Sequence, residues 1–219
     1  MAKIFPTTLI SIFILIGLTA PALSQAKKDT ASINQDPYAQ MLAYSRPGKF
    51  HNLFADLVGT WTFSGSRFEW VDSVTSKVAM KLAGSLVRRP FADGRFFIAE
   101  LTTAAKIDLP VKDGKTINDY AKGIQTEGYD NIKREFQLSY INNHIGSDIV
   151  FWHGSYDSTT RSISYYSKME NVPGMKLNIR FDFVFKDSNH YQWNYFIEQN
   201  GKYIKDSEMN FTRVKTSAK

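Results

Sequence analysis

Apolar and polar residues alternate along most of the chain after Gly59, and this two-residue period predicts β-strands. In the clearest run, every second residue from Leu177 to Phe185 is apolar, and most of the residues between them are polar. The next such run carries its apolar residues at Tyr191, Trp193, Tyr195 and Ile197. Because successive side chains of a strand point to opposite faces, the two runs predict adjacent strands that line one interior with aromatic rings.

Ten segments of this kind follow one another, separated by short stretches rich in Asp, Asn and Gly that are typical of turns. They cover residues 61–70, 77–88, 95–103, 120–129, 135–142, 147–156, 162–169, 175–185, 190–199 and 203–214. No helical crossover lies between them, so consecutive strands should pair antiparallel, and closing the sheet would remove its exposed edges. We therefore predict an all-β fold, an antiparallel up-and-down β-barrel of about ten strands. The alternative is an open sandwich of two sheets.

Two helical patterns precede the strands. Residues 36–42 carry a proline at a first-turn position and predict one or two helical turns within a flexible leader, 25–46. The second pattern ends before Gly59 and has apolar residues at helical spacing, namely Phe50, Leu53, Phe54, Leu57 and Val58. We expect this short N-terminal helix to open the barrel domain, 47–219, and to pack its apolar stripe against the strands.

The first 24 residues have the features of a secretory signal peptide. Lys3 precedes an apolar run, and the small residues Ala22 and Ser24 follow it, which predicts cleavage before Gln25. The run is shorter than the roughly 20 apolar residues that span a bilayer, so we expect no stable membrane anchor after cleavage. These features predict a periplasmic or secreted protein.

Composition narrows the classes of function. The chain has no cysteine, which excludes disulfides and thiol chemistry, and its net charge of +6 is spread without a dense basic stripe, so we expect no nucleic-acid partner. The four histidines are His51, His144, His153 and His190, and none of their spacings matches a metal-binding pair. No nucleophile elbow occurs either. We predict no catalytic residue, no metal and no cofactor, and the sequence leaves the oligomeric state open.

Short motifs in a fixed order carry a family resemblance. Gly59-Thr60-Trp61 directly follows the short helix, as in lipocalins and other calycin barrels. The other motifs are the string from Pro47 to Trp61, Gly128-Tyr129-Asp130-Asn131, Gly154-Ser155-Tyr156-Asp157 and Phe211-Thr212-Arg213. Over about residues 47–214 the chain resembles the bacterial domain of unknown function 1579 family, which implies a lipocalin-like barrel of unknown activity. The resemblance also implies that Trp61 packs beneath Arg213 as a structural pair that closes one barrel end.

The aromatic interior is the candidate binding site, because barrels of about this strand number can hold one small ligand. We expect a small apolar or amphipathic molecule to contact Phe181, Phe183, Trp193 and Tyr195. His153 shares a strand face with Ile149 and Phe151, which predicts an inward histidine that orients the ligand. One alternative is a haem-binding or enzymatic barrel that uses an inward His153 or His190. Another is an interaction module whose interior is packed solid.

Two further features bear on function. Glu100 and Glu127 lie in apolar strand surroundings, where they would be either paired carboxylates or ion-pair partners of the arginines at 67, 88 or 95. Residues 106–119 read as a long loop, which could cover one mouth of the barrel.

Overall fold

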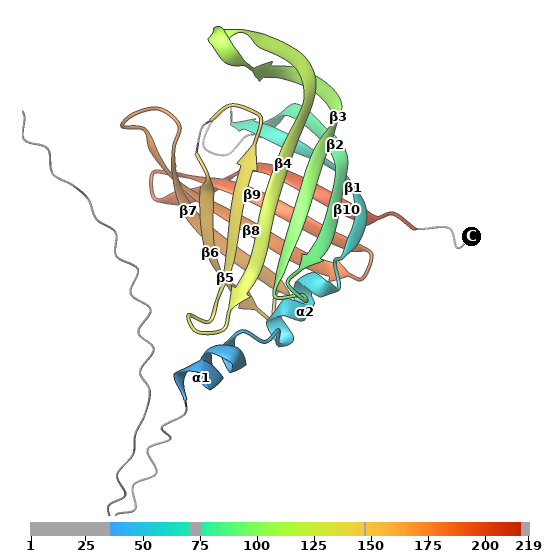
Figure 1. The fold of residues 1–219 in the computed structure, drawn as a ribbon. Coiled ribbons are helices and arrows are strands. Elements are labelled where there is room, and N and C mark those ends of the chain that lie inside the picture. Colours follow the sequence, from blue (N-terminus) through green and yellow to red (C-terminus); the bar gives the residue numbers. More distant parts are fainter. Residues whose placement is uncertain (1–35, 71–75, 147, 216–219) are drawn as a thin grey trace, which may run out of the picture. The chain divides into compact units, whose positions relative to one another are not determined.

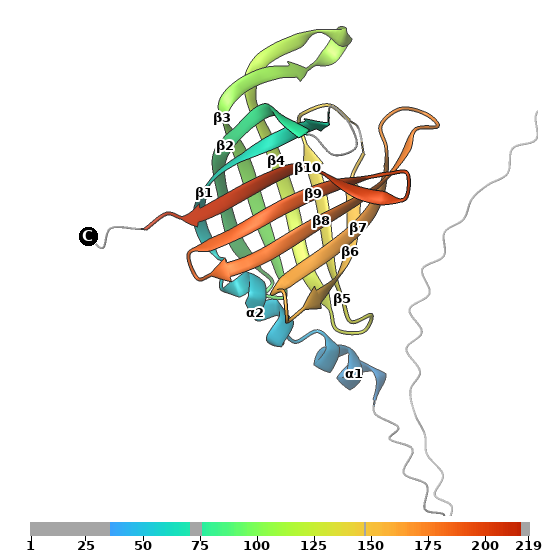
Figure 2. The same cartoon turned by 180° about the vertical axis from the view of Figure 1, so that it is seen from behind.

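Ten antiparallel strands close into one barrel in a computed structural model of the chain, which describes residues 36–70, 76–146 and 148–215 (Figures 1 and 2). The strands are β1 (Gly59–Trp70), β2 (Ser76–Phe91), β3 (Phe96–Pro110), β4 (Thr116–Asp130), β5 (Glu135–Asn142), β6 (Val150–Asp157), β7 (Ser162–Glu170), β8 (Lys176–Asp187), β9 (His190–Gln199) and β10 (Lys202–Arg213). Each strand pairs with the next, and β10 pairs with β1. This closure confirms the predicted up-and-down barrel and excludes the open sandwich.

Two short helices precede the barrel, α1 (Pro37–Tyr44) and α2 (Lys49–Ala55). The Asp36 side chain accepts a hydrogen bond from the Tyr38 backbone N–H at 3.0 Å and so caps α1. At the start of α2, the Nδ1 atom of His51 accepts the Gly48 N–H at 3.0 Å. Neither helix is long and apolar enough to cross a membrane, within the part of the chain that the structure describes. The predicted signal peptide, 1–24, lies outside the described residues.

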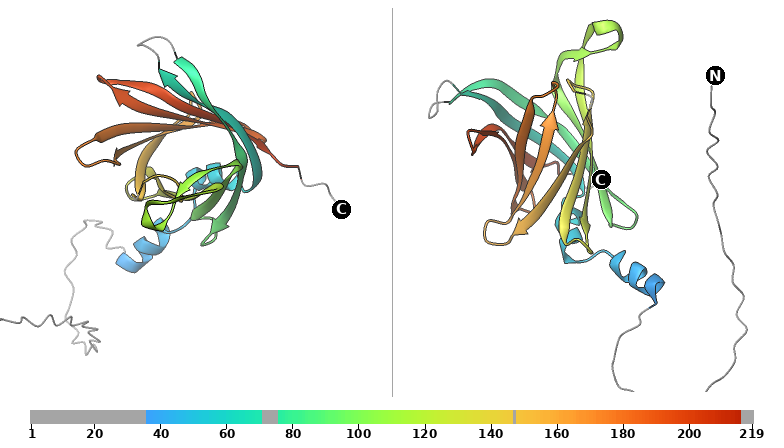
Figure 3. Two further views of the ribbon diagram at one scale, coloured as in Figure 1. Left: turned by 90° about the horizontal axis from the view of Figure 1, so that it is seen from above. Right: turned by 90° about the vertical axis from the view of Figure 1, so that its left-hand side faces the viewer.

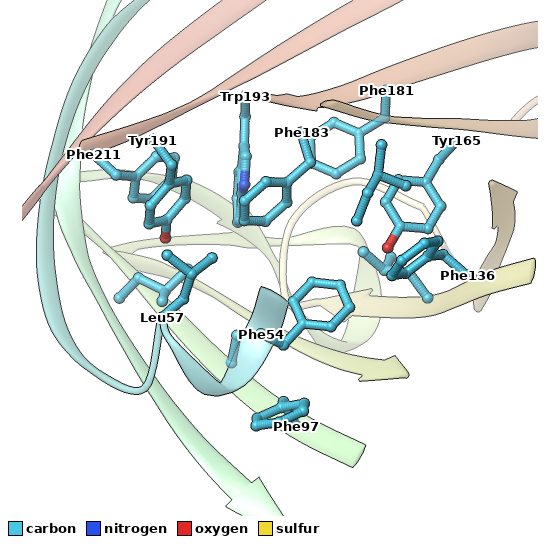
Figure 4. Close-up of a cluster of buried hydrophobic side chains, with 14 of the residues drawn as sticks. Phe54, Leu57, Phe97, Phe136, Tyr165, Phe181, Phe183, Tyr191, Trp193 and Phe211 are labelled. Carbon is cyan, nitrogen blue, oxygen red and sulfur yellow. The ribbon is translucent and has the colours of Figure 1, made fainter. Parts of the chain in front are cut away.

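The helix α2 plugs one end of the barrel. Its Phe54 is fully buried, and its ring centroid lies 5.8 Å from that of Phe97, 5.9 Å from that of Phe136 and 6.0 Å from that of Phe183 (Figure 4). Leu57 follows directly after the helix and is also buried. We call this end of the barrel the floor, the opposite end the mouth, and the space inside the strands the lumen.

Trp61 and Arg213 meet at the floor. The guanidinium carbon of Arg213 lies 4.3 Å from the centroid of the Trp61 ring, which is fully buried. The indole N–H donates to the Leu57 carbonyl at 2.9 Å. Arg213 in turn donates to the carbonyls of Val58 at 2.8 Å and Ser188 at 3.0 Å. The pair therefore joins the segment after α2 to the first and last strands, as the resemblance implies.

The predicted loop over 106–119 is wrong, because this segment is a β-hairpin with a 3-10 turn, η1 (Lys112–Gly114), at its tip. Apolar and polar residues continue to alternate through Ile107 and Leu109, so β3 and β4 keep pairing. Their register shifts between Thr102 and Lys106, and Thr103 bridges the irregularity by accepting the Ala121 N–H at 3.0 Å. Figures 1 and 3 show the hairpin projecting beyond the barrel at the mouth.

Candidate functional site

The floor half of the lumen is filled by stacked aromatic rings. The rings of Phe183 and Tyr191 stack with centroids 4.9 Å apart, and those of Tyr191 and Phe211 stack at 4.4 Å (Figure 4). Phe183 also contacts Phe54 of the plug and has no exposed surface. Phe183 faces inward as the alternation predicts, but it belongs to this packed floor and not to an accessible wall.

A buried ion pair lies beside the floor rings, with the guanidinium carbon of Arg88 5.6 Å from the Phe183 ring centroid and 5.4 Å from that of Tyr191. Arg88 donates from Nε and Nη2 to the two carboxylate oxygens of Glu127 at 2.7 and 2.9 Å, and both side chains are fully buried. Burial disfavours the charge of Arg88, but the attraction of Glu127 outweighs it and the pKa of Arg88 is raised. The hydroxyl of Tyr191 lies 3.5 Å from Nη1. The lumen therefore holds two opposite charges that neutralise each other.

Nearer the mouth, aromatic side chains of β6, β8 and β9 form a continuous wall. The ring of Phe181 lies 5.3 Å from that of Trp193 and 5.9 Å from that of Trp152, and Trp152 lies 5.9 Å from Tyr195. Three inward residues beyond these rings are half-buried, and they are Val150, Leu177 and Ile197. Partial exposure of side chains that face the lumen means that solvent reaches this half from the mouth.

Two of the large inward rings lie over glycines of the neighbouring strand. A Cβ atom at Gly84 would lie 2.5 Å from Phe63, and one at Gly154 would lie 2.7 Å from Tyr165. Phe63 and Gly84 are direct cross-strand partners, as are Tyr165 and Gly154. Each ring therefore occupies the space that a side chain at the glycine would need.

Three polar atoms of inward side chains have no hydrogen-bond partner among the residues that the structure describes. They are Oε1 of Gln125, Oη of Tyr165 and Nε1 of Trp193, and each residue is more than nine-tenths buried. Figure 4 shows the rings of Tyr165 and Trp193 projecting into the lumen from two different strands. Buried polar groups are nearly always paired in proteins, so these three atoms are the lumen groups that are open to a further hydrogen bond.

A second ion pair borders the lumen near the mouth. Asp206 occupies the extra position of a β10 bulge, between Lys205 and Ser207, and its carboxylate lies 3.5 Å from Nε of Arg67. Burial raises the pKa of the Tyr195 phenol, and Asp206 raises it further. Tyr195 is therefore a neutral hydroxyl at physiological pH.

The prediction that His153 points inward is wrong. Its side chain is 57% exposed and pairs with Glu135, Nδ1 to Oε1, at 3.0 Å on the outside of the barrel. It does share a face with Ile149 and Phe151, but that face is the outer one, and Trp152 at the alternate position points inward. His190 also lies outside, 53% exposed and paired with Asp187. The haem or enzymatic alternative therefore loses both of its proposed inward histidines.

The outside of the barrel carries a groove with a volume of about 530 Å³ beneath α1. Met41 and Tyr44 of α1 line one side, while Phe96, Phe151 and His153 of the sheet line the other. Asn131 fastens the end of α1 here, since its Nδ2 donates to the Tyr44 and Arg46 carbonyls at 2.7 and 3.0 Å. No sequence signal pointed to this groove, because it depends on where α1 lies.

The two glutamates that the sequence offered as candidates, Glu127 and Glu100, each form an ion pair with an arginine. Glu127 is the buried partner of Arg88, as one of the two sequence hypotheses holds, whereas Glu100 is about half exposed and pairs with Arg89 at 2.7 Å. The two glutamates are therefore not paired carboxylates. Within the described ranges, no group of three or more His, Asp or Glu side chains is placed to hold a metal ion.

Sequence reasoning missed Trp152, Gln125 and Tyr165 as lumen residues. For Gln125 a signal existed, because it lies two residues before the inward Glu127 and so shares its face. For Trp152 none did, since residues 149–152 are apolar on both faces.

Comparison with known proteins identifies the family of the chain. The model of the family described as protein of unknown function (DUF1579) matches residues 46–213, which is more than half of the chain. No curated protein matches the sequence significantly. Among solved structures, the S-type phycobiliprotein lyase CPES from Guillardia theta is similar with a TM-score of 0.44 and 11% sequence identity, over 80% of this chain and 98% of that chain.

Proposed function

The chain belongs to the family described as protein of unknown function (DUF1579), and we propose that it binds one small amphipathic molecule in the mouth half of its lumen. The site is bounded by Trp152, Phe181, Trp193 and Tyr195, with Gln125 and Tyr165 as further polar contacts. His153 has no part in it. The packed floor and the α2 plug close the other end, so the ligand enters and leaves through the mouth.

The observation that carries this proposal is the set of unpartnered atoms on Gln125, Tyr165 and Trp193. Leaving a buried polar group unmatched costs about 1–3 kcal/mol. All three groups face the same lumen, and each stays unmatched unless a bound molecule or water meets it. A bound molecule that supplies their missing hydrogen bonds recovers that free energy, while the aromatic wall takes its apolar part.

Two neighbouring aromatic residues on β6 give the first test, because they face opposite sides of the wall. Trp152→Ala removes a ring from the lumen, and Phe151→Ala removes one from the outer groove. A panel of small amphipathic compounds would be screened against the purified protein by thermal shift and tryptophan fluorescence. We expect compounds that bind the wild type to bind Trp152→Ala at least about tenfold more weakly and Phe151→Ala unchanged.

A second pair of variants tests entry through the mouth without removing any wall residue. Val150→Trp adds bulk inside the mouth, where the residue is half-buried, and Ile149→Trp adds the same bulk on the exposed outer face. Binding lost in Val150→Trp and retained in Ile149→Trp supports the lumen site. Binding lost only in Ile149→Trp or Phe151→Ala would instead assign the ligand to the outer groove.

We also propose that the protein is exported to the periplasm or secreted, with mature chains that start at Gln25. The sequence of the first 24 residues supports this proposal. N-terminal sequencing of protein from the exported fraction tests it. Protein that still carries residues 1–24 and is found in the membrane fraction would overturn it.

The competing proposal is an interaction module, and the apolar side chains exposed on the outer face of β4–β6 favour it. They include Ile124, Ile141 and Phe151. A panel in which no compound shifts the melting temperature or the fluorescence would leave the interaction module as the better account.

A further inference from the structure

We propose that the ligand presents an uncharged hydrogen-bonding group, such as a hydroxyl or an amide, to the interior of the barrel, and that the site discriminates against anionic and cationic head groups. This inference rests on the proposed lumen site and specifies which class of molecule it takes. It follows from which donors, acceptors and charges of the lumen already have a partner within the protein and which do not.

Two charged pairs face or border the lumen at the depth of the aromatic wall, and each is matched internally. Arg88 directs two donors at Glu127, and the carboxylate of Glu127 receives both. At the mouth, Arg67 and Asp206 form the second ion pair. An ionised ligand head group would therefore enter a half-buried space without a free counter-charge, and burying an unpaired charge is far more costly than burying a neutral group.

The unmatched groups form a neutral and complementary set. Trp193 Nε1–H can only donate, Gln125 Oε1 can only accept, and the Tyr165 hydroxyl can do either. Burial raises the pKa of Tyr165 well above its usual range, so its phenol stays protonated. A hydroxyl or amide both donates and accepts, and it is the kind of group that such a set satisfies.

The depth of these atoms sets the orientation of the ligand. Gln125, Tyr165 and Trp193 are each at most 7% exposed, whereas the apolar residues Leu177 and Ile197 nearer the mouth are half-buried. The polar end of the ligand therefore points inward and its apolar body points toward the mouth. An ordinary surfactant-like arrangement, with the head group in solvent, would leave the three atoms unmatched.

Probes with one body and different head groups test the inference. The purified full-length protein would be titrated calorimetrically with naphthalenemethanol, naphthoate, naphthylmethylamine and methylnaphthalene, and with octanol against octanoate. We expect naphthalenemethanol to bind about tenfold or more tightly than either ionised probe. It should also bind more tightly than methylnaphthalene, by about two- to tenfold for each neutral hydrogen bond gained.

Three variants remove the unmatched atoms one at a time: Gln125→Leu and Tyr165→Phe are near-isosteric, whereas Trp193→Phe also shortens the aromatic wall. Each should reduce the preference for naphthalenemethanol over methylnaphthalene while methylnaphthalene itself still binds. Thr126→Val, at the adjacent outward position where Thr126 bonds Ser139, serves as the matched control and should change neither. Without any probe, Gln125→Leu and Tyr165→Phe should melt at the same temperature as the wild type or higher, since neither loses a hydrogen bond within the protein.

The outcomes separate this inference from the proposed function. If naphthoate binds as tightly as naphthalenemethanol, the inference is overturned and the lumen site stands. If naphthalenemethanol binds but Gln125→Leu, Tyr165→Phe and Trp193→Phe keep the full preference, the inference is again overturned, because the hydroxyl then bonds elsewhere or to water. If no probe binds, the proposed function and the inference fail together.

Discussion

The Tyr165 ring on β7 lies over Gly154 on β6, its direct cross-strand partner. A Cβ atom at residue 154 would stand 2.7 Å from Cδ1 of that ring and 2.8 Å from the Ser164 carbonyl oxygen. The absence of a side chain at Gly154 therefore decides where the ring lies, and with it the position of the unpartnered Tyr165 hydroxyl.

Gly154→Ala should displace this ring and destabilise the protein. Because one of the two close contacts is to backbone, relief requires movement of both strands, and we expect a loss of about 1–3 kcal/mol in the free energy of unfolding. Ser155→Ala, at the adjacent outward position, should stay within about 0.5 kcal/mol. Urea denaturation of both variants measures the difference. Equal stability of the two would show that the ring does not depend on the glycine.

Trp61→Ala should be among the most damaging single changes at the floor. The ring is fully buried, bonds the Leu57 carbonyl and stacks under Arg213, so we expect a cost of about 3–5 kcal/mol. Arg213→Ala should cost less, because its side chain is half-buried and water can reach some of the carbonyls that it leaves. Probe affinity of the folded fraction should be nearly unchanged in both. A variant that melts normally but loses binding would show that the pair belongs to the site.

Arg88→Met should destabilise the barrel by about 3–5 kcal/mol, because Glu127 is left buried without its partner. The double variant Arg88→Met with Glu127→Leu should recover much of that loss, since no unpaired charge is left in the lumen. Denaturation midpoints of the two variants and the wild type provide the measurement. A double variant as unstable as Arg88→Met alone would mean that the ion pair contributes through packing and not through charge.

His51 should make stability depend on pH in the mildly acidic range. Burial lowers the pKa of His51 below its ordinary value of about 6.5, so the unfolded chain binds a proton at this residue more readily than the folded one. The contribution of neutral His51 to the free energy of unfolding should therefore be fully present above about pH 6.5. It should be lost as the pH falls toward the lowered pKa of the folded state. His51→Gln, which keeps a side-chain acceptor for the Gly48 N–H, should flatten this dependence. Melting temperatures between about pH 5 and pH 8 would show the difference, and an unchanged slope in His51→Gln would assign the effect to another group.

The sequence predicts the barrel well because the alternation of apolar and polar residues shows, within each strand, which side chains face the interior. From Leu177 to Phe185 and from Tyr191 to Ile197 one face is apolar and the other mostly polar, so the inward residues can be assigned before any strand is paired. The same logic places Gln125 beside Glu127. The packing of α2 against the strands follows from its apolar stripe, which has to be buried.

The sequence could not resolve β6 or the outer groove. In β6 the apolar residues Val150, Phe151 and Trp152 are consecutive, so both faces look buried and the direction of His153 is ambiguous until the register with β5 and β7 is known. The convergence of Gln125 and Trp193 on one lumen depends on closure of the barrel, which brings β4 and β9 to face a common interior. Such relationships arise from topology and not from local sequence pattern.

The position of a bound probe tests the central claim most directly. Crystals of the protein soaked with naphthalenemethanol should show the naphthalene between Trp152, Phe181 and Trp193, with its hydroxyl within hydrogen-bonding distance of Gln125 Oε1 or Tyr165 Oη. Two results would contradict the claim that this barrel binds its ligand in the lumen. One is electron density beside those atoms that ordered water fully explains, and the other is a probe found only in the groove beneath α1.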